Sequence, residues 1–147
     1  MTISTYSELS TAIGTYMGRS DLSSRADEFI DNLEAKIARR LRIGPMETYV
    51  SGAFTADSPT IALPTGFVEM RSFVFDVSTD EPRKLEYITP EQGDALALSS
   101  SGVPDFYSVV GGVIRLYPTP DAAYTYTIRH FARFVPLSAA TTTNALL

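Results

Sequence analysis

Hydrophobic side chains recur every three or four residues over residues 22–43, the longest helical pattern in the chain. At about 100° per residue they form one apolar stripe. Its members are Leu22, Ala26, Phe29, Ile30, Leu33, Ile37 and Leu41. Ser23 or Ser24 is suited to cap the first turn, and Gly44 followed by Pro45 is suited to end the helix. The pattern therefore predicts an amphipathic helix over residues 22–43.

The two flanks of this stripe carry opposite charges. The basic flank holds Arg25, Lys36, Arg39 and Arg40, and the acidic flank holds Asp27, Asp31 and Glu34. One interpretation is a solvated surface whose charges complement the helix dipole. The other is that the basic flank of one subunit meets the acidic flank of the next in a head-to-tail ring. These residues are our candidate subunit-interface residues.

A second helix is predicted before this one. Thr5 and Glu8 have the spacing of a capping box, apolar residues then follow at helical spacing, and Gly18 is suited to a left-handed helix end. Two amphipathic helices joined by a short link are expected to pack as a hairpin, here over about residues 5–43.

The hydrophobic period changes from 3.6 to 2 after Pro45. The alternation predicts strands over residues 46–54, 60–63, 69–77, 83–87, 105–110, 113–117 and 123–135. Gly111-Gly112 is a two-residue hairpin signal. Thr89 and Gln92 form a capping box that opens a short helix over residues 90–98.

The predicted fold class is therefore α+β. An N-terminal helical hairpin packs with a mainly antiparallel β region at about 46–136 and one short helix, in a single domain over residues 1–147. The tail, residues 137–147, ends on Asn144-Ala145-Leu146-Leu147. This apolar ending has the character of the start of a further helical segment.

Composition limits the functional classes. With 147 residues and 44% hydrophobic content, the chain suits one domain with a real core. It has no cysteine, so a disulfide, a zinc–thiolate site and a cysteine nucleophile are excluded. We expect no signal peptide and no membrane span. The net charge of −5 argues against sequence-specific DNA binding but suits the wall of a channel through which DNA passes.

The sequence contains no clear catalytic constellation. His130 is the only histidine and lies on the more apolar face of a predicted strand, which favours a core or interface role over a general base. The carboxylates Asp27, Glu28 and Asp31 lie at a helix N-terminus, where the dipole explains them without a metal. Gly111-Gly112 is not a phosphate loop, because no helix follows it. We expect no enzymatic activity, no cofactor and no metal.

Aromatic residues are the remaining candidates for binding. The chain has eight Tyr and eight Phe. In strands such residues are most often core or cross-strand pairs, and a fraction belong to intersubunit surfaces. Both interpretations stay open for Tyr107, Tyr117, Tyr124 and Tyr126.

Several short motifs occur in a defined order along the chain. They are EAKIARRLR at 34–42, Met46-Glu47, LPTGFVEMRS at 63–72, TPEQ at 89–92, GVP at 102–104, Tyr107, GVIRLYPTPD at 112–121, Ala132-Arg133, PLS at 136–138 and Thr143-Asn144. In this order and spacing they resemble the head-to-tail adaptor (connector) proteins of short-tailed bacteriophages.

The resemblance implies a non-enzymatic structural protein of the virion. Such adaptors form a homo-oligomeric ring, typically of twelve copies, docked under the portal protein at the head–tail junction after assembly in the host cytoplasm. The ring extends the channel for double-stranded DNA and is a platform for tail or nozzle proteins. Similar proteins continue into further helices at about residues 144–147.

Two alternatives remain open from the sequence. One is a tail-completion or neck protein that binds below the adaptor, for which a sixfold instead of a twelvefold ring is expected. The other is a small carbohydrate- or peptide-binding module, which predicts a monomer with a concave aromatic site.

Overall fold

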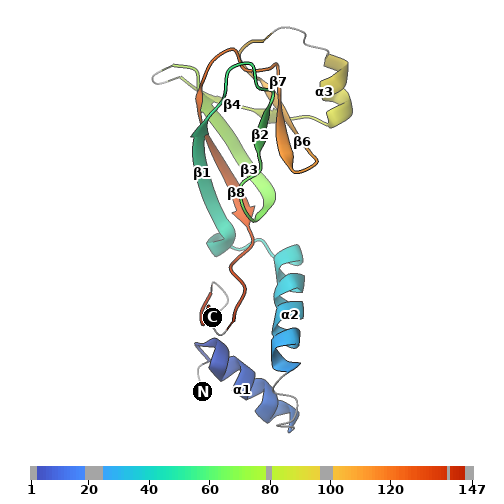
Figure 1. Ribbon diagram of the computed structural model, residues 1–147, viewed down its shortest axis with the longest axis vertical. Helices are drawn as coiled ribbons and strands as arrows, with labels where there is room; N and C mark the ends of the chain where they lie inside the picture. Colours follow the sequence, from blue (N-terminus) through green and yellow to red (C-terminus); the bar gives the residue numbers. More distant parts are fainter. Residues whose placement is uncertain (1–2, 19–24, 79–80, 97–100, 139, 145–147) are drawn as a thin grey trace. The chain divides into compact units, whose positions relative to one another are not determined.

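The computed structural model describes residues 3–18, 25–78, 81–96, 101–138 and 140–144. The chain divides into two compact units (Figure 1). The helical unit comprises Met1–Met46 and Arg133–Leu147, and the β unit comprises Glu47–Ala132. The fold class is α+β, as predicted. The single-domain organisation stays a prediction.

The helical unit begins with α1, Tyr6–Met17. The Thr5 hydroxyl accepts a hydrogen bond from the Glu8 N–H at 3.3 Å, and the Glu8 carboxylate accepts one from the Thr5 N–H at 3.2 Å. Gly18 ends the helix with φ of 62°, a conformation that glycine adopts without the steric cost of a Cβ. The predicted capping box and the predicted glycine end are both confirmed.

The second helix, α2, spans Ala26–Arg40, and its predicted glycine end is wrong. The chain leaves the helix at Leu41, whose backbone is extended, and Gly44 instead begins a short 3₁₀ turn, η2, Gly44–Met46. The Arg42 guanidinium donates to the carbonyls of Ala38 at 3.2 Å and Leu41 at 2.9 Å. This side chain therefore satisfies terminal carbonyls that a left-handed glycine cap would otherwise serve. The predicted start of the helix at Leu22 and its serine caps lie outside the described residues.

The β unit consists of two four-stranded sheets. Sheet 1 has the order β1 (Glu47–Ala53), β8 (Thr125–Ala132), β3 (Phe67–Asp76) and β4 (Pro82–Lys84). Sheet 2 has the order β2 (Thr60–Ala62), β7 (Val113–Tyr117), β6 (Phe106–Val110) and β5 (Glu86–Tyr87). The strand pairs are antiparallel except β5 with β6.

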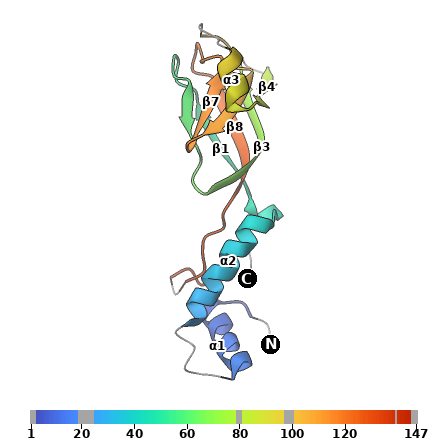
Figure 2. The ribbon, with the colours of Figure 1, turned by 90° about the vertical axis from the view of Figure 1, so that its right-hand side faces the viewer.

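The short helix α3, Pro90–Leu96, lies beside sheet 2 (Figure 2). It begins with the predicted capping box, in which the Thr89 N–H donates to the Gln92 side chain at 3.0 Å and the Gln92 N–H donates to the Thr89 hydroxyl at 3.3 Å. Gly93 is buried against the ring of Tyr117, where a Cβ would overlap the ring. The close approach of α3 to β7 therefore depends on this glycine.

The predicted strand 83–87 is in fact two strands that belong to different sheets. Between β4 and β5 the side chain of Leu85 is buried in the core. Its N–H donates to the Phe73 carbonyl of sheet 1 at 2.9 Å, whereas the Glu86 N–H donates to the Asp105 carbonyl beside sheet 2 at 3.0 Å. The alternating pattern continues through Leu85, so periodicity alone does not mark the crossing.

The core of the β unit lies between the two sheets. Its buried members are Phe54, Phe73, Phe75, Leu85, Tyr107, Ile114, Leu116 and Ile128. Phe73 of β3 and Tyr107 of β6 meet edge to face with ring centroids 5.5 Å apart, and this contact joins the sheets. Tyr107 and Tyr117 are buried, while Tyr124 and Tyr126 are partly buried against the core. The core interpretation therefore holds for these tyrosines.

Replacing Phe73 with alanine should lower the free energy of unfolding of the β unit by about 3–5 kcal/mol, because a large side chain is lost from between the sheets. Urea denaturation followed by the near-ultraviolet circular dichroism of tyrosine measures the change. Val110→Ala is the matched control, because Val110 is 42% exposed, and it should cost less than about 1 kcal/mol. Equal losses for both variants would contradict this description of the core.

Candidate functional site

His130 is buried within the β unit and does not form a catalytic group with other described residues. The residue is 1% exposed, and neither ring nitrogen has a geometrically sound hydrogen-bond partner among the described residues. The imidazole stacks on Phe67 with ring centroids 5.7 Å apart. Burial lowers the pKa of His130, so the ring stays neutral at neutral pH. These contacts are those of a core histidine.

Across the described residues, no group of three or more His, Cys, Asp or Glu side chains is placed to hold a metal ion. Nor does any helix among those residues combine the length and hydrophobicity that a membrane span requires.

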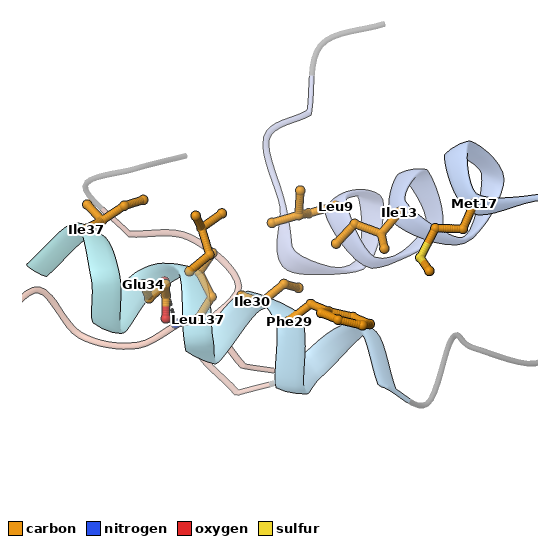
Figure 3. Close-up of a pocket in the computed structure, with 9 residues that line it drawn as sticks. Leu9, Ile13, Met17, Phe29, Ile30, Glu34, Ile37 and Leu137 are labelled. Carbon is orange, nitrogen blue, oxygen red and sulfur yellow. Dashed lines mark hydrogen bonds between the residues drawn. The ribbon is translucent and has the colours of Figure 1, made fainter.

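The predicted interface residues all lie on the helical unit, and one of them, Glu34, lines an apolar groove there. The groove has a volume of about 500 Å³. In Figure 3, side chains of α1 point toward α2 across it. Its lining comes from Leu9, Ile13 and Met17 of α1, from Phe29, Ile30, Leu33, Glu34 and Ile37 of α2, and from Leu137.

The apolar stripe of α2 is covered on one side only. Ala26 and Ile30 are buried, but Phe29 is 51% exposed and Leu33 is 57% exposed. The amphipathic pattern alone does not show that this half of the stripe is left in contact with solvent. The two exposed side chains adjoin the groove, and a contiguous apolar surface of this kind is typical of an interaction site.

Glu34 was predicted on the acidic flank, but the structure buries it. The residue is 6% exposed, and its carboxylate oxygens accept hydrogen bonds from the Leu137 N–H at 3.1 and 3.2 Å. The Asn144 side-chain amide donates to the same carboxylate at 2.7 Å and to the Val135 carbonyl at 3.0 Å. Buried backbone donors need acceptors, and Glu34 supplies one to the C-terminal tail.

Asp27 also has a partner within the chain. The Asp27 carboxylate raises the pKa of Tyr6 to about 12, mainly by hydrogen bonding to the phenol and further by its negative charge. The Tyr6 N–H donates to the Thr142 carbonyl at 2.8 Å. The first turn of α1 is thereby tied both to α2 and to the tail. Asp27 and Asp31 are both exposed, so Glu34 alone of the three predicted acidic residues is buried.

The basic flank remains open to solvent. Arg25, Lys36, Arg39 and Arg40 are all exposed, and none has an ion-pair partner among the residues that the structure describes. On a helical wheel these cations lie beside Phe29 and Leu33. The structure thus joins a basic flank to an exposed apolar surface, and it assigns much of the acidic flank to contacts inside the unit.

Sequence analysis missed the tail residues that complete this unit. Leu137 is buried at 5% exposure, and Thr142 and Asn144 bind α1 and α2. Leu137 is the only large apolar side chain in residues 137–144, which is a local signal that the tail packs. The polar contacts of Thr142 and Asn144 have no local signal.

Comparison with known proteins identifies a family. Residues 4–147 match the family described as SU10 adaptor protein. No curated protein matches the chain significantly.

Glu34→Ala should release the tail from α2, because the Leu137 N–H and the Asn144 amide lose a charged acceptor, and such bonds contribute about 1.5–3 kcal/mol each. Hydrogen exchange followed by mass spectrometry should show faster exchange over residues 137–144. Glu28→Ala on the same helix is the control, because Glu28 is exposed. Unchanged protection of the tail in Glu34→Ala would contradict the described contact.

Asp27→Asn should bring the pKa of Tyr6 from about 12 back toward its ordinary value of about 10. The raised pKa means that the folded chain holds the phenol proton more tightly than the unfolded chain. This contribution to stability is complete below about pH 10 and is lost as the pH rises toward about 12. Ultraviolet titration of tyrosinate, with the Tyr6→Phe spectrum subtracted, isolates Tyr6. An identical titration in the wild type and in Asp27→Asn would rule out the hydrogen bond.

Proposed function

This chain belongs to the SU10 adaptor protein family, and on that premise we propose that it forms a ring beneath the portal protein of a bacteriophage. The family makes the chain a phage adaptor and a virion component. Membership also favours a structural role without catalysis, with portal and tail proteins as partners. A ring of twelve copies, at the junction of a short tail, is the assembly that we propose.

The exposed surface of α2 carries this proposal. Phe29 and Leu33 are each more than half exposed beside the groove. Full burial of such side chains contributes about 1.5–3 kcal/mol each, so covering their exposed halves would contribute about 1 kcal/mol each. A neighbouring subunit placed on this surface would remove both from water.

Charge supports a head-to-tail arrangement of the subunits. The cations of the basic flank adjoin the apolar surface, whereas Asp31 lies on the opposite flank of the same helix. Different surfaces of successive copies can then meet, which is the condition for a closed ring with heterologous contacts. Glu34 and Asp27 have partners inside the unit, so they support the helical unit and contribute less directly to the interface.

In this proposal DNA passes through the ring without being read. The net charge of −5 would repel the phosphate backbone and limit adhesion of DNA to the channel wall. Tail or nozzle proteins would bind the ring at surfaces of the β unit.

Reversing two charges of the basic flank, Arg39→Glu with Arg40→Glu, should reduce ring formation or docking on the portal without unfolding the subunit, because both side chains are exposed. Native mass spectrometry counts the copies per ring, and circular dichroism checks the fold. A twelvefold ring supports the adaptor, and a sixfold ring would favour a tail component.

Two further variants sharpen this test. Arg83→Glu with Lys84→Glu makes the same change of charge on β4, where both residues are exposed, and should leave the ring intact. Adding Asp31→Arg to the α2 reversal should restore part of the assembly if Asp31 meets the basic flank of the next copy. Normal assembly of the Arg39/Arg40 variant would rule out this interface.

A further inference from the structure

The two sheets of the β unit have four edge strands, and three of them are poorly suited to pairing with another chain. β2 and β4 have three residues each, β5 has two, and β4 begins with Pro82. Short edges and proline are devices by which proteins prevent unwanted strand addition. The fourth edge, β1, has seven residues and contains neither proline nor lysine.

The register shows which backbone groups of β1 are unpaired. The Phe54 N–H donates to the Tyr124 carbonyl at 2.9 Å, directly after the last β1–β8 pair. Hydrogen-bonded and non-hydrogen-bonded pairs alternate in an antiparallel ladder. Thr48, Val50 and Gly52 therefore bond to β8. The N–H and C=O groups of Glu47, Tyr49, Ser51 and Ala53 point away from the sheet, toward the open edge seen at the margin of sheet 1 in Figure 1.

Side chains on both surfaces of β1 would be covered by an added strand. Tyr49 is 70% exposed on the outer surface of sheet 1, and Val50 is 41% exposed on the opposite surface. Both side chains flank the open backbone groups. Strand addition would therefore satisfy the backbone and remove apolar area from water at the same time.

Charge on the outer surface indicates the chemistry of the missing strand. Arg129 of β8 lies directly opposite Tyr49. It is exposed and has no ion pair with any residue that the structure describes. The next strand position lies about 10 Å from the Arg129 backbone, within the combined reach of an arginine and a glutamate. Glu47 already pairs with Arg71 at 3.9 Å.

We propose that β1 is the docking edge for an extended segment of another virion protein. The segment adds antiparallel to β1 and carries carboxylate side chains on the surface of Arg129. A second copy of this chain fits less well. Among the described strands of that copy, β1 itself is the only long open edge. An antiparallel register that places Glu47 of that copy beside Tyr49 would pair only residues 47–49 of the two strands. This inference depends on membership of the adaptor family and does not depend on the ring.

The test uses the full chain and a synthetic peptide in which valine and glutamate alternate. Saturating peptide should slow hydrogen exchange of the Tyr49 and Ser51 amides at least about tenfold, as measured by nuclear magnetic resonance. The matching valine–lysine peptide should bind about tenfold more weakly, and Arg129→Glu should reverse this preference. Failure of the glutamate peptide to protect these amides, or equal binding of both peptides, would overturn the proposal.

Ser51→Pro separates strand addition from simple surface adhesion. It removes an N–H that points away from β8, so the ladder within sheet 1 should survive, while peptide affinity should fall about tenfold or more. Ser51→Ala is the matched control. It removes only the hydroxyl that lies 3.1 Å from the Thr127 hydroxyl, and affinity should stay within about twofold. Wild-type affinity in Ser51→Pro would contradict strand addition.

The same exchange measurement identifies the natural occupant. In the complete connector purified from virions, the Tyr49 and Ser51 amides should be protected, and in the chain alone they should exchange rapidly at every concentration. Protection that rises with the concentration of the chain alone would identify a second copy and overturn the assignment to another protein. Absence of protection in both samples would overturn it as well. The two proposals can fail separately. If the chain forms no ring but the peptide still protects the β1 amides, strand addition is supported and the proposed ring is contradicted.

Discussion

The carboxylate of Glu34 links two segments that are distant in sequence, α2 and the C-terminal tail. Through the Leu137 N–H and the Asn144 amide, it holds the C-terminal tail against the second helix. α1 has no buried residue, so packing between the helices alone would be a weak basis for the unit. Because the buried acceptor is on α2 and the donors are on the tail, the helical unit requires both ends of the chain.

This constraint also explains the exposed surface of the unit. The tail and α1 cover the side of α2 that carries Ile30 and Glu34, and they leave Phe29 and Leu33 in solvent. One side of the apolar stripe of α2 is buried by contacts within the subunit. The other side stays exposed and is available to a neighbouring subunit. The open basic flank lies along that available side, so in the proposed ring apolar burial and charge would both favour a partner at the same surface.

The edge strands of the β unit differ in length, and therefore in how many backbone hydrogen-bonding groups they leave unpaired. Leu85 takes the chain from one sheet to the other, so that the strands on either side of it are short and end their sheets. β1 has no such limit and presents a longer row of unpaired groups. We propose this edge as a point of attachment through backbone hydrogen bonds, whereas the helical unit offers side-chain contacts. The two surfaces would therefore serve different partners.

Local chemistry in the sequence was enough to predict the capping boxes at Thr5 and Thr89, the left-handed Gly18 and most strands, because each depends on residues only a few positions apart. The motif order also indicated the adaptor family. The position of Glu34 could not be predicted in this way. Its helical spacing assigned it to the acidic flank, but the tail, about a hundred residues away in sequence, buries its carboxylate as a hydrogen-bond acceptor. The tertiary structure likewise decided that one strand pattern around Leu85 serves two sheets. Such outcomes depend on which groups, distant in sequence, compete for the same hydrogen-bond donor or the same space. The local hydrophobic periodicity of the sequence contains no information about that competition.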